Sequence, residues 1–127
     1  MSASGAGNVE VVELLLELGM KPNTSSHTGD TPLMAAASDG SPKVARLLIK
    51  AGAKVNAANK QNKTALMYAA EGYKNGDILK VLLENGADPY LKANGKTALE
   101  LCKENSNHFG AKARIKILKE AMKNSSR

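Results

Sequence analysis

The sequence predicts an all-α solenoid, in which helix–loop–helix units stack side by side and are joined by hairpin turns. The first observation is a phrase that opens with threonine and recurs every 33 residues, at positions 31, 64 and 97. Its three forms are Thr31-Pro-Leu-Met-Ala-Ala-Ala, Thr64-Ala-Leu-Met-Tyr-Ala-Ala and Thr97-Ala-Leu-Glu-Leu-Cys-Lys. The second observation is a leucine-rich phrase that ends in glycine at positions 19, 52 and 86. Such a period is typical of units that bury their apolar faces only against their neighbours.

The totals of the sequence fit one domain with a core of small side chains. Of 127 residues, 43% are hydrophobic but only 3% are aromatic, so aliphatic residues and alanine must fill the core. The single cysteine, Cys102, excludes an internal disulfide and a four-cysteine zinc site. The first residues lack the basic and apolar regions of a signal peptide, and no apolar run approaches the ~18 residues of a membrane span. We therefore expect a soluble, intracellular protein, cytoplasmic or nuclear.

Each threonine of the repeated phrase is expected to begin a first helix. A threonine hydroxyl at the N-cap accepts a backbone N–H that the first turn leaves without a partner. Pro32 suits the first helical position, where its missing N–H costs nothing. Thr97 and Glu100 have the spacing of a capping box. The alanines that follow are small enough to let neighbouring helices approach closely.

The leucine-rich phrase predicts the second helix of each unit. Its paired apolar residues are expected to be buried between units, and they are Leu47-Leu48-Ile49 and Val81-Leu82-Leu83. Gly52 and Gly86 suit the helix end, where the backbone needs a positive φ. The polar segments 54–62 and 88–95 that follow are rich in turn-forming residues and predict hairpin turns.

These two phrases, with the 33-residue period and the Val55-Asn56 ending, resemble the ankyrin repeat over roughly residues 8–110. The resemblance implies antiparallel helix pairs in a curved array, with hairpins projecting at about a right angle. It predicts one domain over residues 1–127. Its units are a truncated first repeat (8–30), a repeat (31–63), a repeat with a one-residue insertion near Tyr73 (64–96) and a C-terminal capping repeat (97–127). The short first unit suggests an excerpt from a longer protein or an engineered chain.

The chain departs from the family pattern in the fourth residue of the threonine phrase. The family places a histidine there, whereas this chain has Met34, Met67 and Glu100. We therefore expect the side-chain hydrogen bonds of that histidine to neighbouring turns to be missing.

The resemblance further implies a protein-binding module, without catalysis, that uses the turn tips and the exposed parts of the first helices as a concave surface. Three columns of turn residues follow from the 33-residue offset: Asp30, Lys63 and Lys96; Thr28, Gln61 and Asn94; His27, Lys60 and Ala93. The first helices contribute Ser38, Asp39, Glu71 and Lys103, and the irregular loop contributes Tyr73. We hypothesise that acidic residues of the partner lie over Lys60, Lys63 and Lys96. The alternative is that these lysines are ordinary solvated turn residues.

The remaining aromatic residues are expected to pack within the protein. Tyr68 falls inside a first helix, where the family usually has leucine, and Tyr90 replaces a turn asparagine and is expected to cover the hairpin. Tyr73 and Phe109 lie in irregular loops, where core-edge packing is favoured over partner contact.

Two other modes of binding stay open from the sequence. An apolar stripe of Val12, Leu15 and Leu16 could pair with a second copy or with another part of a parent chain. The last helix, expected at about 111–123, carries Lys112, Lys116, Lys119 and Lys123 on one face of a chain with a net charge of +6. That face could bind anionic lipid or nucleic acid, although a solvated capping helix explains it better.

Enzymatic activity is not expected, and neither are a metal, a cofactor or a small-molecule substrate. The two histidines, His27 and His108, are far apart in the sequence, and Cys102 falls at a position that the repeat reserves for small buried residues. Two histidines and one cysteine do not make a recognisable set of metal ligands.

Overall fold

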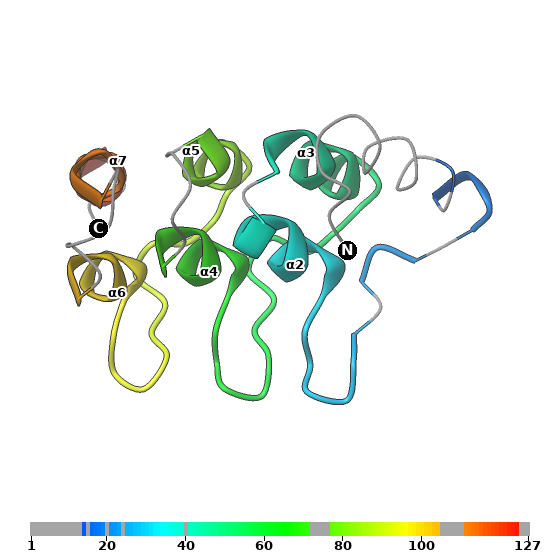
Figure 1. Ribbon diagram of the computed structural model, residues 1–127, viewed down its shortest axis with the longest axis horizontal. Coiled ribbons are helices and arrows are strands. Elements are labelled where there is room, and N and C mark those ends of the chain that lie inside the picture. Colours follow the sequence, from blue (N-terminus) through cyan, green and yellow to red (C-terminus); the bar gives the residue numbers. More distant parts are fainter. Residues whose placement is uncertain are drawn as a thin grey trace.

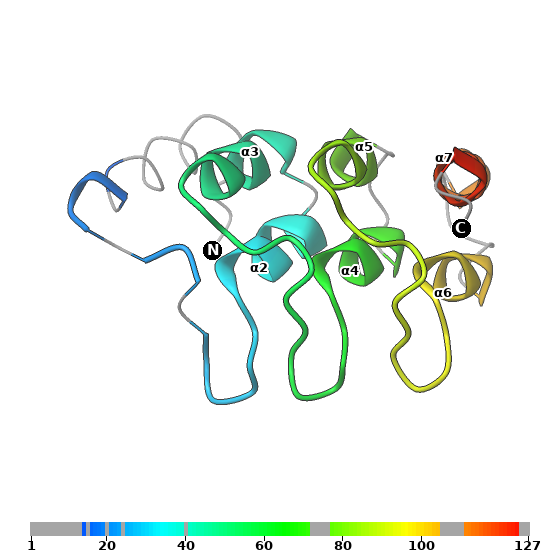
Figure 2. The same ribbon diagram turned by 180° about the vertical axis from the view of Figure 1, so that it is seen from behind.

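The computed structural model describes residues 14, 16–19, 21–23, 25–39, 41–71, 77–104 and 111–124. Its named helices are α2 (Pro32–Asp39), α3 (Pro42–Lys50), α4 (Ala65–Glu71), α5 (Asp77–Glu84), α6 (Ala98–Glu104) and α7 (Ala111–Asn124). They form two rows: an inner row of α2, α4 and α6, from which the hairpins extend, and an outer row of α3, α5 and α7 (Figure 1). The view from behind shows the same two rows (Figure 2). The predicted all-α repeat fold is confirmed. Of the truncated first unit, 8–30, residues 8–13, 15, 20 and 24 lie outside this description.

The inner helices begin where the threonines predicted. Thr31 Oγ1 accepts a hydrogen bond of 3.3 Å from Met34 N, and Pro32 is the first residue of α2. The capping box at α6 is complete, because Glu100 N donates to Thr97 Oγ1 at 3.3 Å and Thr97 N donates to Glu100 Oε1 at 3.1 Å. At the starts of α2 and α6, these bonds satisfy backbone N–H groups that the first turn leaves without partners.

The outer helices α3, α5 and α7 each bury one leucine at the same place in the repeat. Leu48, Leu82 and Leu118 are 0–1% exposed. Between the rows, the small side chains of the inner helices are also buried: Ala36, Ala37, Ala69 and Ala70. Gly52 ends the first of these outer helices with a φ of 108°, as the sequence predicted. The apolar periodicity of the sequence therefore predicts both the two rows of helices and the register in which the units stack.

Arg114 is a core residue that the sequence reading assigned to no role. It precedes Leu118 by four residues, as Val44 precedes Leu48 and Ile78 precedes Leu82, and all three residues are buried. Its side chain is 0% exposed, and its Nε donates a hydrogen bond of 3.3 Å to the carbonyl of Ala70 near the end of α4. A cation is favourable near the carbonyl end of a helix. Apart from Arg114, the basic residues of α7 form the exposed face that the sequence predicted. They are Lys112, Lys116, Lys119 and Lys123.

Asparagine side chains join consecutive units at the start of the first two hairpin segments. Asn23 Nδ2 donates to the carbonyl of Gly52 at 3.0 Å, and its Oδ1 accepts from Lys54 N at 2.7 Å. Asn56 makes the same pair of bonds, at the same distances, to Gly86 and Asp88. Tyr90 stands at this place in the third unit. Its hydroxyl donates to the carbonyl of Met122 on α7 at 2.6 Å, which joins the third hairpin segment to the last helix. The expectation that Tyr90 covers the hairpin stays a prediction.

The third hairpin has a shorter tip than the first two. Ala93 and Lys96 pair through both backbone hydrogen bonds, of 2.9 and 3.1 Å, so that two residues form the tip. In the second hairpin three residues separate Asn59 from Lys63, which are joined by a bond of 3.0 Å from Asn59 N to Lys63 O. The placement of Ala93 in one column with His27 and Lys60 is therefore corrected. Ala93 is 4% exposed and corresponds to Asn59, because the third hairpin is one residue shorter than the second and the difference lies in its tip.

Candidate partner-binding surface

The three hairpins extend in the same direction from the inner row, so that their tips lie along one edge of the molecule (Figure 1). We call this surface, together with the ends of α2, α4 and α6, the hairpin face. Its exposed predicted residues are His27, Thr28, Asp30, Ser38, Lys60, Gln61, Asn94 and Lys103. Lys63, Glu71 and Lys96 also lie on it and are partly buried. Tyr73 and the side chain of Asp39 lie outside the described residues.

The first two hairpins are hydrogen-bonded to each other. Lys60 N donates to the carbonyl of Thr28 at 3.0 Å, which joins the two tips through the backbone. A Cβ atom added to Gly29 would lie 3.1 Å from both Asn59 Cα and Lys60 N. Gly29 also has a φ of 84°, in the region that favours glycine. Close approach of the two tips thus depends on this glycine.

Asn59 is the side chain that joins the two hairpins to α4. It is 7% exposed, and its Nδ2 donates to Asp30 Oδ1 and to the Tyr68 hydroxyl, both at 2.8 Å. Its Oδ1 accepts from the backbone N–H groups of Gln61 and Lys63, at 2.9 and 3.0 Å. All four hydrogen-bonding positions of the amide are used, so this side chain is held in one orientation. The prediction that Tyr68 packs within the protein is confirmed, since it lies against the core.

Asp30 has structural partners in addition to its place on the surface. Its Oδ2 accepts a hydrogen bond of 2.9 Å from the Thr28 hydroxyl, while its Oδ1 accepts from Asn59. These bonds, that of Asn59 first, lower the pKa of the Asp30 carboxyl below its ordinary value. The carboxylate is therefore committed to the hairpin and is a weaker candidate for partner contact than its exposure suggests.

Two of the three predicted lysines form ion pairs with the ends of the inner helices. Lys63 Nζ pairs with Glu71 and lies 4.4 Å from the ring centroid of Tyr68, and Lys96 pairs with Glu104. Each pair spans eight residues, from the last residue before the threonine to the end of its helix. In the described part of the chain, Lys60 makes no ion pair. Of the three predicted lysines, Lys60 is therefore the one whose charge is not already paired with a glutamate.

Sequence reasoning missed Asn59 and both ion pairs. The only sequence signal for Asn59 was a polar residue at a hairpin position where the first unit has Ser26. The ion pairs had a stronger signal, because in two units a lysine is followed eight residues later by a glutamate. This spacing does not predict a contact, because the lysine lies in the hairpin and the glutamate lies in the helix. Only the fold shows that a hairpin residue returns to the end of its own helix.

The side chains that could act in catalysis or bind a metal ion include one thiol, which is buried in the core. Cys102 is 0% exposed, and burial raises the pKa of its thiol, with the nearby Arg114 guanidinium opposing that shift. Within the described ranges, His, Cys, Asp and Glu side chains form no group of three that could hold a metal ion. His108 lies outside these ranges. As for membranes, the helices that the structure describes are all too short or too polar to cross a bilayer.

Two rows of paired helices with hairpins projecting from one of them define a repeat protein of the α-solenoid class. The family model of ankyrin repeats, in three copies, matches residues 1–93. The chain belongs to the ankyrin-repeat family. No curated protein matches the chain. Ankyrin repeats are generally protein–protein interaction modules, and the family is typically non-catalytic.

Proposed function

We propose that the chain binds a partner protein or peptide through the hairpin face, as a concave surface, and that it is not an enzyme. The observation that carries this proposal is the direct bond between hairpins, from Lys60 N to the carbonyl of Thr28 at 3.0 Å. Together with the four bonds of Asn59, it makes the first two tips one continuous edge. A surface that is ordered before binding loses less conformational entropy when the partner docks.

The exposed residues on this edge favour a polar partner segment. His27, Gln61 and Asn94 offer hydrogen-bonding groups at successive tips, and Ser38 and Lys103 do so on the inner helices. Lys60 provides a positive charge for an acidic residue of the partner. Lys63 and Lys96 would contact acidic residues only in competition with Glu71 and Glu104, so we expect them to contribute less than Lys60.

The test begins with affinity capture of a partner from cells that express the protein, followed by measurement of its affinity with purified components. Lys60→Glu reverses a charge on the hairpin face, and Lys43→Glu reverses one on the exposed side of α3. We expect Lys60→Glu to weaken binding about fivefold, as loss of about 1 kcal/mol at an interface does, and Lys43→Glu to leave it unchanged. Ser38→Arg is a second hairpin-face change with the same expectation. Equal affinities for all these variants would refute the proposal.

A second candidate function is assembly through the first unit. Leu14 and Leu18, which are four residues apart, are 55% and 74% exposed, and exposed apolar pairs of this kind favour contact with another surface. Of the predicted stripe, Leu16 is partly buried, while Val12 and Leu15 lie outside the described residues. Sedimentation at several concentrations tests self-association. A monomer at high concentration would exclude it, and a dimer that dissociates on Leu18→Ser would support it.

A further inference from the structure

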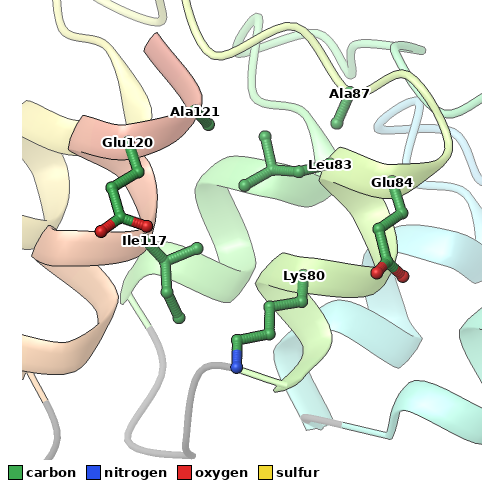
Figure 3. A pocket seen from close by; sticks show the side chains of 7 residues that line it. All are labelled: Lys80, Leu83, Glu84, Ala87, Ile117, Glu120 and Ala121. Atoms are coloured by element: carbon green, nitrogen blue, oxygen red, sulfur yellow. The ribbon is translucent and has the colours of Figure 1, made fainter. Parts of the chain in front are cut away.

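The outer row contains a groove that the proposed function does not use. It lies between α5 and α7 and has a volume of about 350 Å³. Leu83 and Ile117 line it from opposite helices, and Ala87 and Ala121 line it nearer one end (Figure 3). Pockets that hold ligand groups are mostly apolar, with volumes of about 300–1,000 Å³. The groove is thus large enough for an amino-acid side chain and the backbone that carries it.

One small residue in the last helix, Ala121, lines the groove with only a methyl group. Ala121 follows the buried Leu118 by three residues, as Asn85 follows Leu82. Asn85 lies directly after α5, and its amide Nδ2 donates to the carbonyl of Val81 at 2.7 Å. The last helix thus has a methyl group at the position where the preceding unit has a larger side chain.

Acidic side chains lie on both sides of the groove. Glu84 is on α5 and Glu120 is on α7, with Leu83 and Ile117 between them (Figure 3). Both glutamates are exposed, and within the described residues neither forms an ion pair. The ammonium group of Lys80 lies at the end of the groove away from Ala87 and Ala121 (Figure 3). In a chain with a net charge of +6, the groove thus has a carboxylate on each of two sides of an apolar floor and one lysine at its end.

We propose that this groove binds a segment of a partner protein that carries an aliphatic side chain with a basic residue two positions away. The aliphatic side chain packs on Leu83 and Ile117, and the basic group lies near the carboxylates of Glu84 and Glu120. The groove belongs to the outer row and the hairpin tips to the inner row, so occupation of one surface leaves the other accessible. The inference therefore goes beyond the proposed function, and the chain would bring two partners together.

The proposal is tested by NMR titration of the ¹⁵N-labelled chain with three blocked pentapeptides. The probe peptide has leucine at its centre and arginine at both ends, separated by glycines. One comparison peptide has glutamate in place of both arginines, and the other has serine in place of leucine. We expect the probe to shift the amides of Leu83, Ala87 and Ala121 and to bind about fivefold more tightly than either comparison. Loss of two weak exposed charge contacts, of about 0.5 kcal/mol each, gives this factor for the glutamate peptide. Loss of the apolar burial of leucine, about 1 kcal/mol at a partly exposed site, gives it for the serine peptide.

Variants separate the groove from general attraction to the protein. Ala121→Gln should fill the groove and abolish the shifts, while Ala113→Gln, on an exposed position of the same helix, should leave them unchanged. Glu84→Gln combined with Glu120→Gln should keep the shifts but remove the preference for arginine over glutamate. The dispersion of each spectrum shows that the variant is folded.

Three results would overturn the proposal. They are equal binding of all three peptides, shifts confined to the hairpin face, and unchanged binding by a folded Ala121→Gln variant. None of these results would refute the binding of a partner by the hairpin face, which is measured separately.

Discussion

Asn59 Nδ2 donates a hydrogen bond of 2.8 Å to Asp30 Oδ1 and thereby joins the hairpin of one repeat to the hairpin of the preceding one. The two residues are 29 positions apart in the sequence. Because Asn59 also holds the backbone of its own tip and the hydroxyl of Tyr68, one buried amide connects two hairpins and a helix.

Replacement of Asn59 should lower the unfolding free energy more than replacement of Gln61, an exposed residue of the same hairpin tip. Asn59→Ala removes four hydrogen bonds and leaves two backbone N–H groups without that acceptor, which costs about 2 kcal/mol of unfolding free energy. Gln61→Ala alters an exposed side chain in the same tip and should change stability by less than about 0.5 kcal/mol. Denaturation in urea measures both values. Equal losses would show that the Asn59 network does not stabilise the hairpins.

The contribution of Asp30 should disappear in acid. Its hydrogen bonds favour the carboxylate, so its pKa is lower in the folded than in the unfolded protein. The stabilisation is therefore complete above the unfolded-state pKa of about 4 and is lost as the pH falls through the lower folded-state pKa. Urea denaturation of wild type and Asp30→Asn should show their largest difference near neutral pH and a shrinking difference below about pH 4. A difference that grows in acid would contradict this assignment.

The close contact between the first two tips predicts that alanine substitution lowers stability by different amounts at two glycines. Gly29→Ala and Gly95→Ala both place a side chain at a positive φ, of 84° and 78°, and so have similar backbone strain. Only at Gly29 would the new Cβ meet backbone, at 3.1 Å, whereas nothing lies within 4 Å at Gly95. We expect Gly29→Ala to cost about 1 kcal/mol more in unfolding free energy, by thermal or chemical denaturation. A larger loss at Gly95 would be inconsistent with this packing.

Arg114 should tolerate an apolar replacement better than a truncation. Arg114→Ala leaves a cavity at a fully buried site and should cost about 3 kcal/mol. Arg114→Met keeps most of the volume and puts an apolar residue where α3 and α5 have Val44 and Ile78. Because apolar replacements of buried charges are often neutral or stabilising, we expect a change within about 1 kcal/mol. Equal losses for the two variants would instead indicate that the charge itself is essential.

Features that depend on local signals could be predicted from the sequence. Thr31 and Thr97 begin helices because their hydroxyls lie within reach of the next N–H groups, and this does not depend on distant residues. The rows and their register follow from a repeated apolar pattern, with Leu48 and Leu82 at its most buried points.

Features that depend on contacts between units could not be predicted in the same way. A lysine-rich last helix gave no reason to separate Arg114 from its exposed neighbours, because its burial is set by the end of α4. The pairing of Lys63 with Glu71 likewise requires the hairpin to return to its own helix. The sequence therefore indicated which residues lie on the hairpin face but not which of their charges are already paired.

Hydrogen–deuterium exchange of the complex with the captured partner tests the central claim most directly. If the hairpin face binds the partner, amides in segments 26–30, 59–63 and 93–96 should exchange more slowly in the complex than in the free chain. Amides of α3 and α5 should be unchanged. Slower exchange confined to the outer helices, with the hairpin segments unaffected, would contradict the claim.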